Sequence, residues 1–180
     1  RAFSPLAPRH VSQADDVDPV LAGLQLAGTD LRDEGFATCA DRLDLPGFDV
    51  RMHFEPADFV QVNAEMNRRM VGRALELLDL TATDRVLDLF CGVGNFTLPI
   101  ARLGATAVGV EGDAALVARA RANAARNGLG ALAEFHVADL FADCAGLPWL
   151  RGRMDAVILD PPRAGAEAIL PALAASGARR

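Results

Sequence analysis

Apolar residues gather in four short stretches from residue 85 onward, with charged residues, glycine or proline between them. Apolar runs of about four to eight residues between such turn signals are typical of strands buried in a parallel sheet. The four predicted strands are Arg85–Phe90, Ala105–Val110, Leu132–Val137 and Met154–Leu159.

The segments before and between these strands show apolar residues at helical spacing instead. The predicted helices are Ala64–Leu78, Asn95–Leu103 and Ala114–Asn127, the last closed by Gly128 as a C-cap. The first helix is expected to bury the stripe Met66, Met70, Ala74 and Leu78. Alternating strands and helices predict an α/β fold, a doubly wound parallel sheet with its four strands in the order 3-2-1-4.

The first third of the chain is less regular. Val17–Leu26 predicts a short helix, and Phe48–Phe54 alternates apolar and polar residues as a half-buried strand does. Proline, glycine and aspartate are frequent between them.

A glycine-rich turn follows the first predicted strand, at Cys91–Gly94. Gly92 and Gly94 allow a ligand to approach the backbone closely. A dinucleotide-binding turn would place Gly or Ala where Thr97 stands, which disfavours NAD and FAD. Asp88 before the turn suits a cofactor with a cationic amino-acid group, such as S-adenosylmethionine (SAM). The alternative to a cofactor-binding loop is a strand-turn-helix in which the glycines only make the turn.

Acidic residues also follow the other strands, at the edge where open parallel sheets bind ligands. Glu111 stands 17 residues after Gly94, close to the spacing of roughly 20 at which an acid accepts ribose hydroxyls. Asp139 could accept a hydrogen bond from an adenine amino group, or could be a solvated acid at a strand end. Asp160 begins an Asp-Pro-Pro turn, in which proline restrains the aspartate to an extended conformation.

Three segments together carry a resemblance to a known family: DFVQVN at 58–63, DLFCGVGNFTLPIA at 88–101 and LDPPRAGA at 159–166. In order and spacing they resemble the SAM-dependent RNA uracil-carbon-five methyltransferases. Phe90 and the Thr-Leu-Pro at 97–99 favour the branch that acts on 23S ribosomal RNA over the transfer-RNA branch.

The resemblance implies a Rossmann-like fold of the class I SAM-dependent methyltransferases, truncated after the fourth strand. It implies that residues 1–57 are what remains of a central or linker domain and that 58–180 are the SAM-binding core. The residues expected to contact SAM are Gln61, Phe90, Asn95, Glu111, Asp139 and Asp160, with Asp88, Gly92 and Gly94 shaping the loop.

The family's reaction adds a cysteine thiolate to carbon six of uracil and later removes the carbon-five proton with a base. The resemblance places this cysteine, in a Ser-Cys-Asn-Pro segment, and the base beyond Arg180. Cys39 and Cys144 have no nearby histidine or basic partner in the sequence, and Cys91 lies inside the cofactor loop, where its thiol would meet the methionine part of SAM rather than a uracil, so none of the three is expected to be the nucleophile. No catalytic residue is therefore assigned within the chain.

The three cysteines lack paired metal-ligand spacing, so no metal site is predicted, and an iron–sulfur cluster is expected only in a full-length parent. No apolar run reaches about 18 residues, which argues against a membrane span. Unpaired cysteines suit the cytoplasm. Oligomeric state stays open.

The net charge of −6 arises in residues 1–60, which hold 5 Arg and 11 acids, whereas 61–180 hold 13 of each. This distribution leaves no basic footprint for nucleic acid, so ribosomal RNA is expected to bind mainly through the full-length protein. Arg163, Arg68 and Arg69 are the local candidates for phosphate contacts.

Two other functions remain open. An amino methyltransferase would use the same Asp-Pro-Pro turn, although an aromatic residue would then be expected where Arg163 stands. A SAM-binding module without catalysis is the other, because no nucleophile is recognised.

Overall fold

The computed structural model describes residues 41–61 and 63–180. The predicted helix Val17–Leu26 lies outside the described residues, as does Cys39. Within them the strands β3 (Arg85–Leu89), β4 (Thr106–Glu111), β5 (Ala133–Val137) and β6 (Ala156–Leu159) form one parallel sheet in the order β5-β4-β3-β6. The predicted strand order 3-2-1-4 and the α/β fold class are confirmed.

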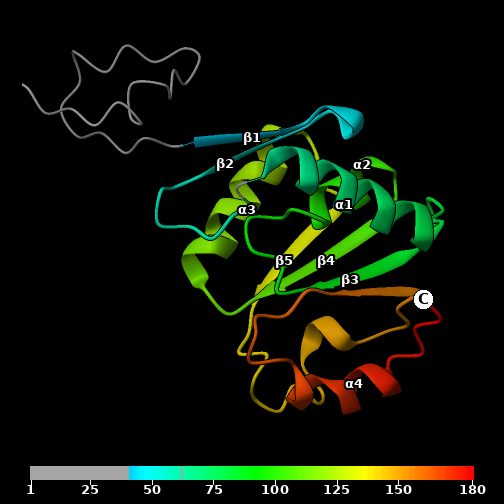
Figure 1. Cartoon of the computed structure of the whole chain (residues 1–180). Coiled ribbons are helices and arrows are strands. Elements are labelled where there is room, and N and C mark those ends of the chain that lie inside the picture. Colours follow the sequence, from blue (N-terminus) through cyan, green and yellow to red (C-terminus); the bar gives the residue numbers. More distant parts are fainter. Residues whose placement is uncertain (1–40, 62) are drawn as a thin grey trace, which may run out of the picture. The chain divides into compact units, whose positions relative to one another are not determined.

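Helices cover both faces of this sheet (Figure 1). One face carries α1 (Ala64–Leu78), α2 (Thr97–Arg102) and α3 (Ala114–Arg126). The other carries the short turns η3 (Pro148–Leu150) and η4 (Glu167–Ile169) and the helix α4 (Leu170–Ala175). Alternate residues of the strands supply the two cores: Val86 packs with the first group and Leu87 with the second.

Helix α1 has the predicted bounds, and Asn63 caps it by accepting the Met66 N–H at 2.9 Å. Its predicted buried stripe is only partly right, since Met70, Ala74 and Leu78 are partly buried against the core. Asn67, Val71 and Leu75 are the buried residues, while Met66 is 53% exposed. The stripe was predicted from hydrophobicity alone, and a buried asparagine that finds a partner escapes such a pattern.

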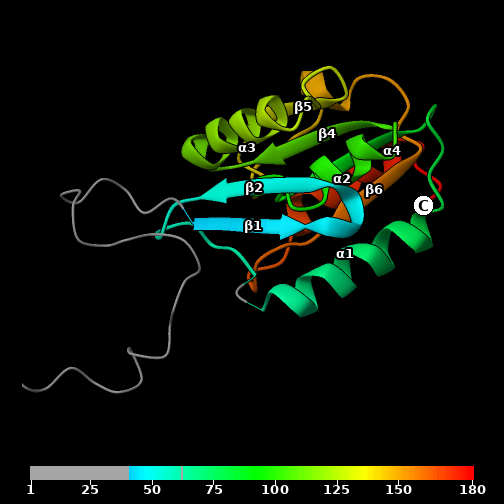
Figure 2. The same cartoon turned by 90° about the horizontal axis from the view of Figure 1, so that it is seen from above.

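A two-stranded antiparallel hairpin precedes α1. It pairs β1 (Asp41–Leu45) with β2 (Val50–Phe54) through the turn η2 (Pro46–Phe48). The strand predicted at Phe48–Phe54 is thus shorter by two residues, because Pro46 opens a tight turn, and its partner β1 was not predicted. Figure 2 shows the hairpin between α1 and α3. Its buried Leu45 and Met52 belong to the core cluster of the sheet.

The helix predicted from Asn95 begins only at Thr97. Gly94 has a φ of 98°, which is not helical, so the two residues after it remain in the turn.

The outer edge of β6 is partly covered by residues 179 and 180. The N–H of Arg179 donates to the Asp155 carbonyl at 3.1 Å, and the Val157 N–H donates to the Arg180 carbonyl at 2.9 Å. The Arg180 guanidinium also donates to the carbonyls of Leu78 and Asp79 at the end of α1. These contacts fasten the last two residues between β6 and α1.

Candidate functional site

The turn after β3 needs its two glycines for different reasons. Gly92 has a φ of 54°, and a Cβ atom built there would meet no atom within 4 Å, so its backbone faces open space. At Gly94 a Cβ atom would lie 3.1 Å from Cγ of Leu98, so this glycine allows α2 to pack closely. The Cys91 N–H donates to the Val110 carbonyl at 3.1 Å and ties the turn to β4.

Asp88 lies buried beneath this turn, with 1% of its surface exposed. Its Oδ2 accepts a hydrogen bond from the Thr97 hydroxyl at 2.5 Å. Its Oδ1 has no hydrogen-bond partner among the described residues, although that atom is fully buried. A buried carboxylate oxygen without a partner is costly, which makes this atom the most unusual polar group of the site.

Burial raises the pKa of Asp88 to about 7, although hydrogen bonds from Thr97 counteract part of this effect. The charges of Asp160 and Glu111 raise it further. The ends of β6, β3 and β4 therefore bring three carboxyl groups close enough to repel one another. Within the described part of the chain, none of the three has an ion-pair partner. Such an edge favours a positively charged ligand.

Glu111 is half-buried at the end of β4, and backbone N–H groups orient its carboxylate. Oε2 accepts from Gly92 at 3.2 Å, and Oε1 accepts from Gly112 at 2.7 Å and Asp113 at 3.1 Å. This side chain thus links the glycine turn to the start of α3. Each oxygen is held in a defined direction by bonds to rigid backbone, as a ligand contact requires.

Asp139 is exposed after β5, and its Oδ1 accepts the N–H of Phe141 at 2.9 Å. Phe141 was not predicted as part of the site. Its ring is 54% exposed and packs at a tilt against Phe90, with 5.6 Å between ring centroids. Phe90 holds this position with a φ of 62°, rare for a bulky residue. The two rings form an apolar wall at the same edge as the three acids.

Asn95 is half-buried in the turn, and its side-chain amide faces that of Asn67 on α1. Each amide donates to the oxygen of the other at 2.9 Å. Because an amide has two N–H groups and two lone pairs, Asn95 keeps one of each for a ligand. Asn67 is fully buried. The sequence pattern counts it as one of the polar, exposed positions of α1, so it was not predicted.

Gln61 is half-buried on the segment between β2 and α1. Three residues earlier, Asp58 accepts the Glu55 N–H at 2.8 Å and a short hydrogen bond from Arg119 on α3. The same guanidinium lies 3.0 Å from Oε1 of Glu55. Neither Asp58 nor Arg119 was singled out in the sequence.

Asn123 on α3 and Asn127, the C-cap of that helix, bind the hairpin, and Asn123 also joins it to the site. The side-chain amide of Asn123 accepts the His53 N–H at 2.9 Å and donates to the His53 carbonyl at 3.0 Å. It also donates to the Val93 carbonyl in the glycine turn at 3.3 Å. One turn later, Asn127 pairs in the same way with the backbone of Arg51. These two side-chain amides thus satisfy the backbone N–H and carbonyl groups of Arg51 and His53, as a neighbouring strand would.

The two described cysteines, Cys91 and Cys144, are buried and free. Burial raises the pKa of both thiols, and for Cys91 the charges of Asp88 and Glu111 raise it further. Both are therefore uncharged thiols at neutral pH, which is unsuited to nucleophilic attack.

The arginines considered for phosphate contacts differ in their surroundings. Arg68 and Arg69 both pair with Glu65 on α1, at 3.4 and 2.8 Å. Arg163 is exposed after the Asp-Pro-Pro turn. Of these three arginines, only Arg163 has no ion-pair partner among the described residues.

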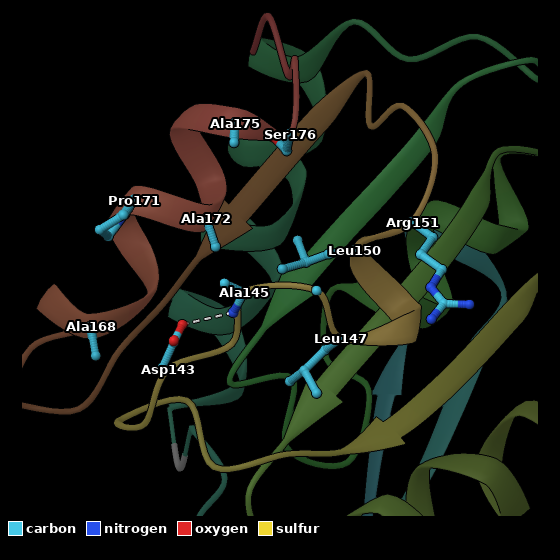
Figure 3. Close-up of a pocket in the computed structure, with 11 residues that line it drawn as sticks. Asp143, Ala145, Leu147, Leu150, Arg151, Ala168, Pro171, Ala172, Ala175 and Ser176 are labelled. Carbon is cyan, nitrogen blue, oxygen red and sulfur yellow. Dashed lines mark hydrogen bonds between the residues drawn. The ribbon is translucent and has the colours of Figure 1, made fainter.

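A cavity of about 540 Å³ lies elsewhere, between residues 143–151 and α4 (Figure 3). Leu147, Leu150 and Ala172 are among its lining residues, and none of the nine predicted site residues is. The acids and glycines instead lie on the edge formed by the carboxyl ends of the strands. Among the described residues, no three metal-binding side chains cluster, and no helix has the length and apolarity to cross a bilayer.

Comparison with known proteins bears on this arrangement. The profile of a family described as tRNA (Uracil-5-)-methyltransferase matches residues 37–174. The chain is 55% identical over 129 residues to a protein of Xanthomonas euvesicatoria pv. vesicatoria named 23S rRNA (uracil(1939)-C(5))-methyltransferase RlmD. It is 56% identical over 141 residues to a protein of that name from Alkalilimnicola ehrlichii. These matches cover 72% and 77% of the chain, but only 29% and 32% of the relatives.

Solved structures are similar as well. The Pyrococcus abyssi tRNA (uracil-54, C5)-methyltransferase, in complex with S-adenosyl-L-homocysteine, matches with a TM-score of 0.60 and 28% identity over 79% of this chain and 33% of that one. An RNA methyltransferase from Salinibacter ruber, in complex with the same ligand, matches with a TM-score of 0.50 and 33% identity over 61% and 68%. The predicted resemblance is confirmed, and the chain belongs to the tRNA (Uracil-5-)-methyltransferase family.

Proposed function

We propose that this chain binds SAM and forms the cofactor-binding part of a 23S ribosomal RNA uracil-carbon-five methyltransferase. The observation that carries the proposal is the buried Oδ1 of Asp88, which has no hydrogen-bond partner among the described residues. A cationic group at this position would satisfy the carboxylate and offset its burial.

The other residues of the site also fit SAM. SAM carries an ammonium group and a sulfonium centre, and both favour an edge where Asp88, Glu111 and Asp160 repel one another. The backbone-oriented carboxylate of Glu111 suits ribose hydroxyls. The ring of Phe90 suits an adenine face, with Asp139 nearby at the end of β5. The proposed cofactor residues are Gln61, Asp88, Phe90, Gly92, Gly94, Asn95, Glu111, Asp139 and Asp160.

When bound, SAM supplies an activated methyl group. The residues described here hold and orient it: Asp88 anchors the positive end, and Glu111 with the glycine turn sets the position of the ribose. Attack on uracil needs a thiolate, which neither Cys91 nor Cys144 provides. In the proposed function the full-length protein supplies the nucleophile and the base, and neither is assigned to a described residue.

The ribosomal RNA substrate is proposed from the relatives, since those quoted above are named as 23S rRNA methyltransferases and the chain spans about a third of their length. Arg163, exposed after the Asp-Pro-Pro turn, is the proposed local contact to a phosphate. The free thiols of Cys91 and Cys144 agree with a cytoplasmic location, which is part of the same proposal.

Calorimetric titration of the 180-residue chain with SAM tests the cofactor, with NADH as the control. We expect SAM to bind and NADH not to bind. Replacing Asp88 or Glu111 with Ala should weaken SAM binding by ~1–3 kcal/mol, the cost of a lost charge-assisted hydrogen bond. Unchanged affinity in both variants would sink the assignment of the loop.

The substrate is tested in the full-length parent. A methylated 23S rRNA product mapped to carbon five of uracil supports the proposal, whereas methylation at a nitrogen would return the amino methyltransferase to consideration.

A further inference from the structure

The segment that carries Gln61 is fastened to α3 by one partly buried ion pair. Asp58 has only 4% of its side chain exposed, and Arg119 has 23%. The Arg119 guanidinium bonds Asp58 through one nitrogen and lies 3.0 Å from Glu55 through the other. A planar guanidinium can hold two carboxylates at once, which a lysine ammonium does with less geometric control.

The other end of the segment is fastened to the glycine turn. Asn63 caps α1, and one turn later Asn67 exchanges two hydrogen bonds with Asn95. Asp58 is thus anchored at the second turn of α3, and Asn67 is anchored beside the loop after β3. The crossing, residues 59–66, therefore runs from Arg119 on α3 to the glycine turn that holds Asn95.

Gln61 lies on this crossing, only three residues from Asp58. Two of its described residues are weakly held by the core, since Phe59 is 88% exposed and Val60 only partly packs on it. Its position therefore depends on its two ends rather than on burial.

We infer that Arg119 is a positioning residue for the cofactor: by holding Asp58, it keeps Gln61 over the glycine turn. This inference rests on the proposed function, because it concerns the same SAM site. Arg119 touches no cofactor in this scheme, and its effect on binding passes through Gln61. Removal of the guanidinium should free the crossing and weaken binding, whereas an arginine that only stabilises α3 would affect folding alone.

The test is a double-mutant cycle read by calorimetric titration with S-adenosylhomocysteine. The variants are Arg119→Gln, Gln61→Ala and the double variant, with Arg73→Gln as the matched control. Arg73 forms an ion pair with Glu76 on the exposed face of α1, at 3.2 Å. It is a matched control because it also pairs with a carboxylate but does not touch the crossing.

We expect Arg119→Gln and Gln61→Ala each to weaken binding at least tenfold, and the double variant to be weakened little beyond the single ones. Such coupling is the signature of two residues that act through one another. Arg73→Gln should bind as the unchanged chain does. Affinity of Arg119→Gln within twofold of the unchanged chain, or losses that simply multiply in the double variant, would overturn the inference.

Denaturant unfolding of each variant shows that it is folded at the titration temperature. If Arg119→Gln does not fold, Asp58→Asn replaces it in the cycle, because it removes the charge partner of Arg119 and keeps an oxygen for the Glu55 N–H. If the unchanged chain is folded and binds no S-adenosylhomocysteine, the proposed function fails. If it binds and the cycle shows no coupling, only the role of Arg119 fails.

Discussion

The hydroxyl of Thr97 donates a 2.5 Å hydrogen bond to Oδ2 of Asp88, across the glycine turn that separates the two residues in sequence. Both side chains are buried. The bond joins the end of β3 to the first residue of α2 and leaves Oδ1 as the free end of the carboxylate. The protonation state of this one group therefore affects both folding and ligand binding.

The ligand-free chain should lose stability as pH rises from about 4 to about 7. The pKa of Asp88 is raised from 3.8 to about 7 in the folded state, so the fold favours the protonated form. In this window the unfolded chain releases the proton and the folded chain keeps it, which favours unfolding. Urea unfolding at pH 5 and pH 8 should show a loss on the order of 2–4 kcal/mol from this group.

Asp88→Asn is the control for that measurement, since it keeps an oxygen for Thr97 and removes the titration. The difference in stability between this variant and the unchanged chain should grow between pH 5 and pH 8, in favour of the variant. A difference that stays constant with pH would show that Asp88 does not titrate in this range.

S-adenosylhomocysteine, which retains the ammonium group of SAM, should bind more tightly as pH rises toward 7. The ammonium favours ionised Asp88, and below the folded pKa that ionisation must accompany binding. The affinity should rise by up to about tenfold per pH unit between pH 5.5 and 6.5 and level off above pH 7. In Asp88→Asn the affinity should be weaker and nearly independent of pH over this range.

Asn67→Ala should destabilise the chain by roughly 1–3 kcal/mol, because it removes a buried amide and leaves that of Asn95 without its partner. Urea unfolding measures the loss. Asn95→Ala and the double variant complete the comparison. The combined loss should be clearly smaller than the sum of the single losses, whereas full additivity would show that the two amides do not depend on each other.

Gly109→Ala should destabilise the chain by about 1–3 kcal/mol, because its Cβ atom would lie 2.7 Å from the ring of Phe135 and 2.9 Å from Sγ of Cys91. Gly72 on α1 is the matched control, since nothing lies within 4 Å of a Cβ atom there. Gly72→Ala should stabilise by about 0.5–1 kcal/mol through helix propensity. Thermal and urea unfolding of both variants test the pair, and equal effects of the same sign would contradict it.

Local patterns were sufficient to predict much of the fold. The bounds of α1 and the order of the four parallel strands follow from hydrophobic period, capping residues and the right-handed crossover rule, which act over a few residues or on consecutive elements. The glycine turn and the acids after the strands could be placed on one edge for the same reason. The structure brings Asp88, Glu111 and Asp160 together as that rule requires.

Contacts between distant residues could not be predicted in this way. Asn67 and Asn95 are 28 positions apart, and Asn127 meets Arg51 across 76 positions. An asparagine in a helix scores as polar whether it faces water or pairs with a buried backbone. The burial of Asn67 on α1 and the hydrogen bonds of Asn123 and Asn127 to β2 could therefore not be predicted.

The sequence by itself thus determined the strands, their order and the residues that reach the ligand-binding edge, because spacing and side-chain chemistry are local properties. Only the tertiary structure decided which of those groups are desolvated. Burial raises the pKa of Asp88 and of two thiols. It also shields the ion pair of Arg119 with Asp58 from solvent. Desolvation depends on everything packed around a group, and that arrangement exists only in the folded chain.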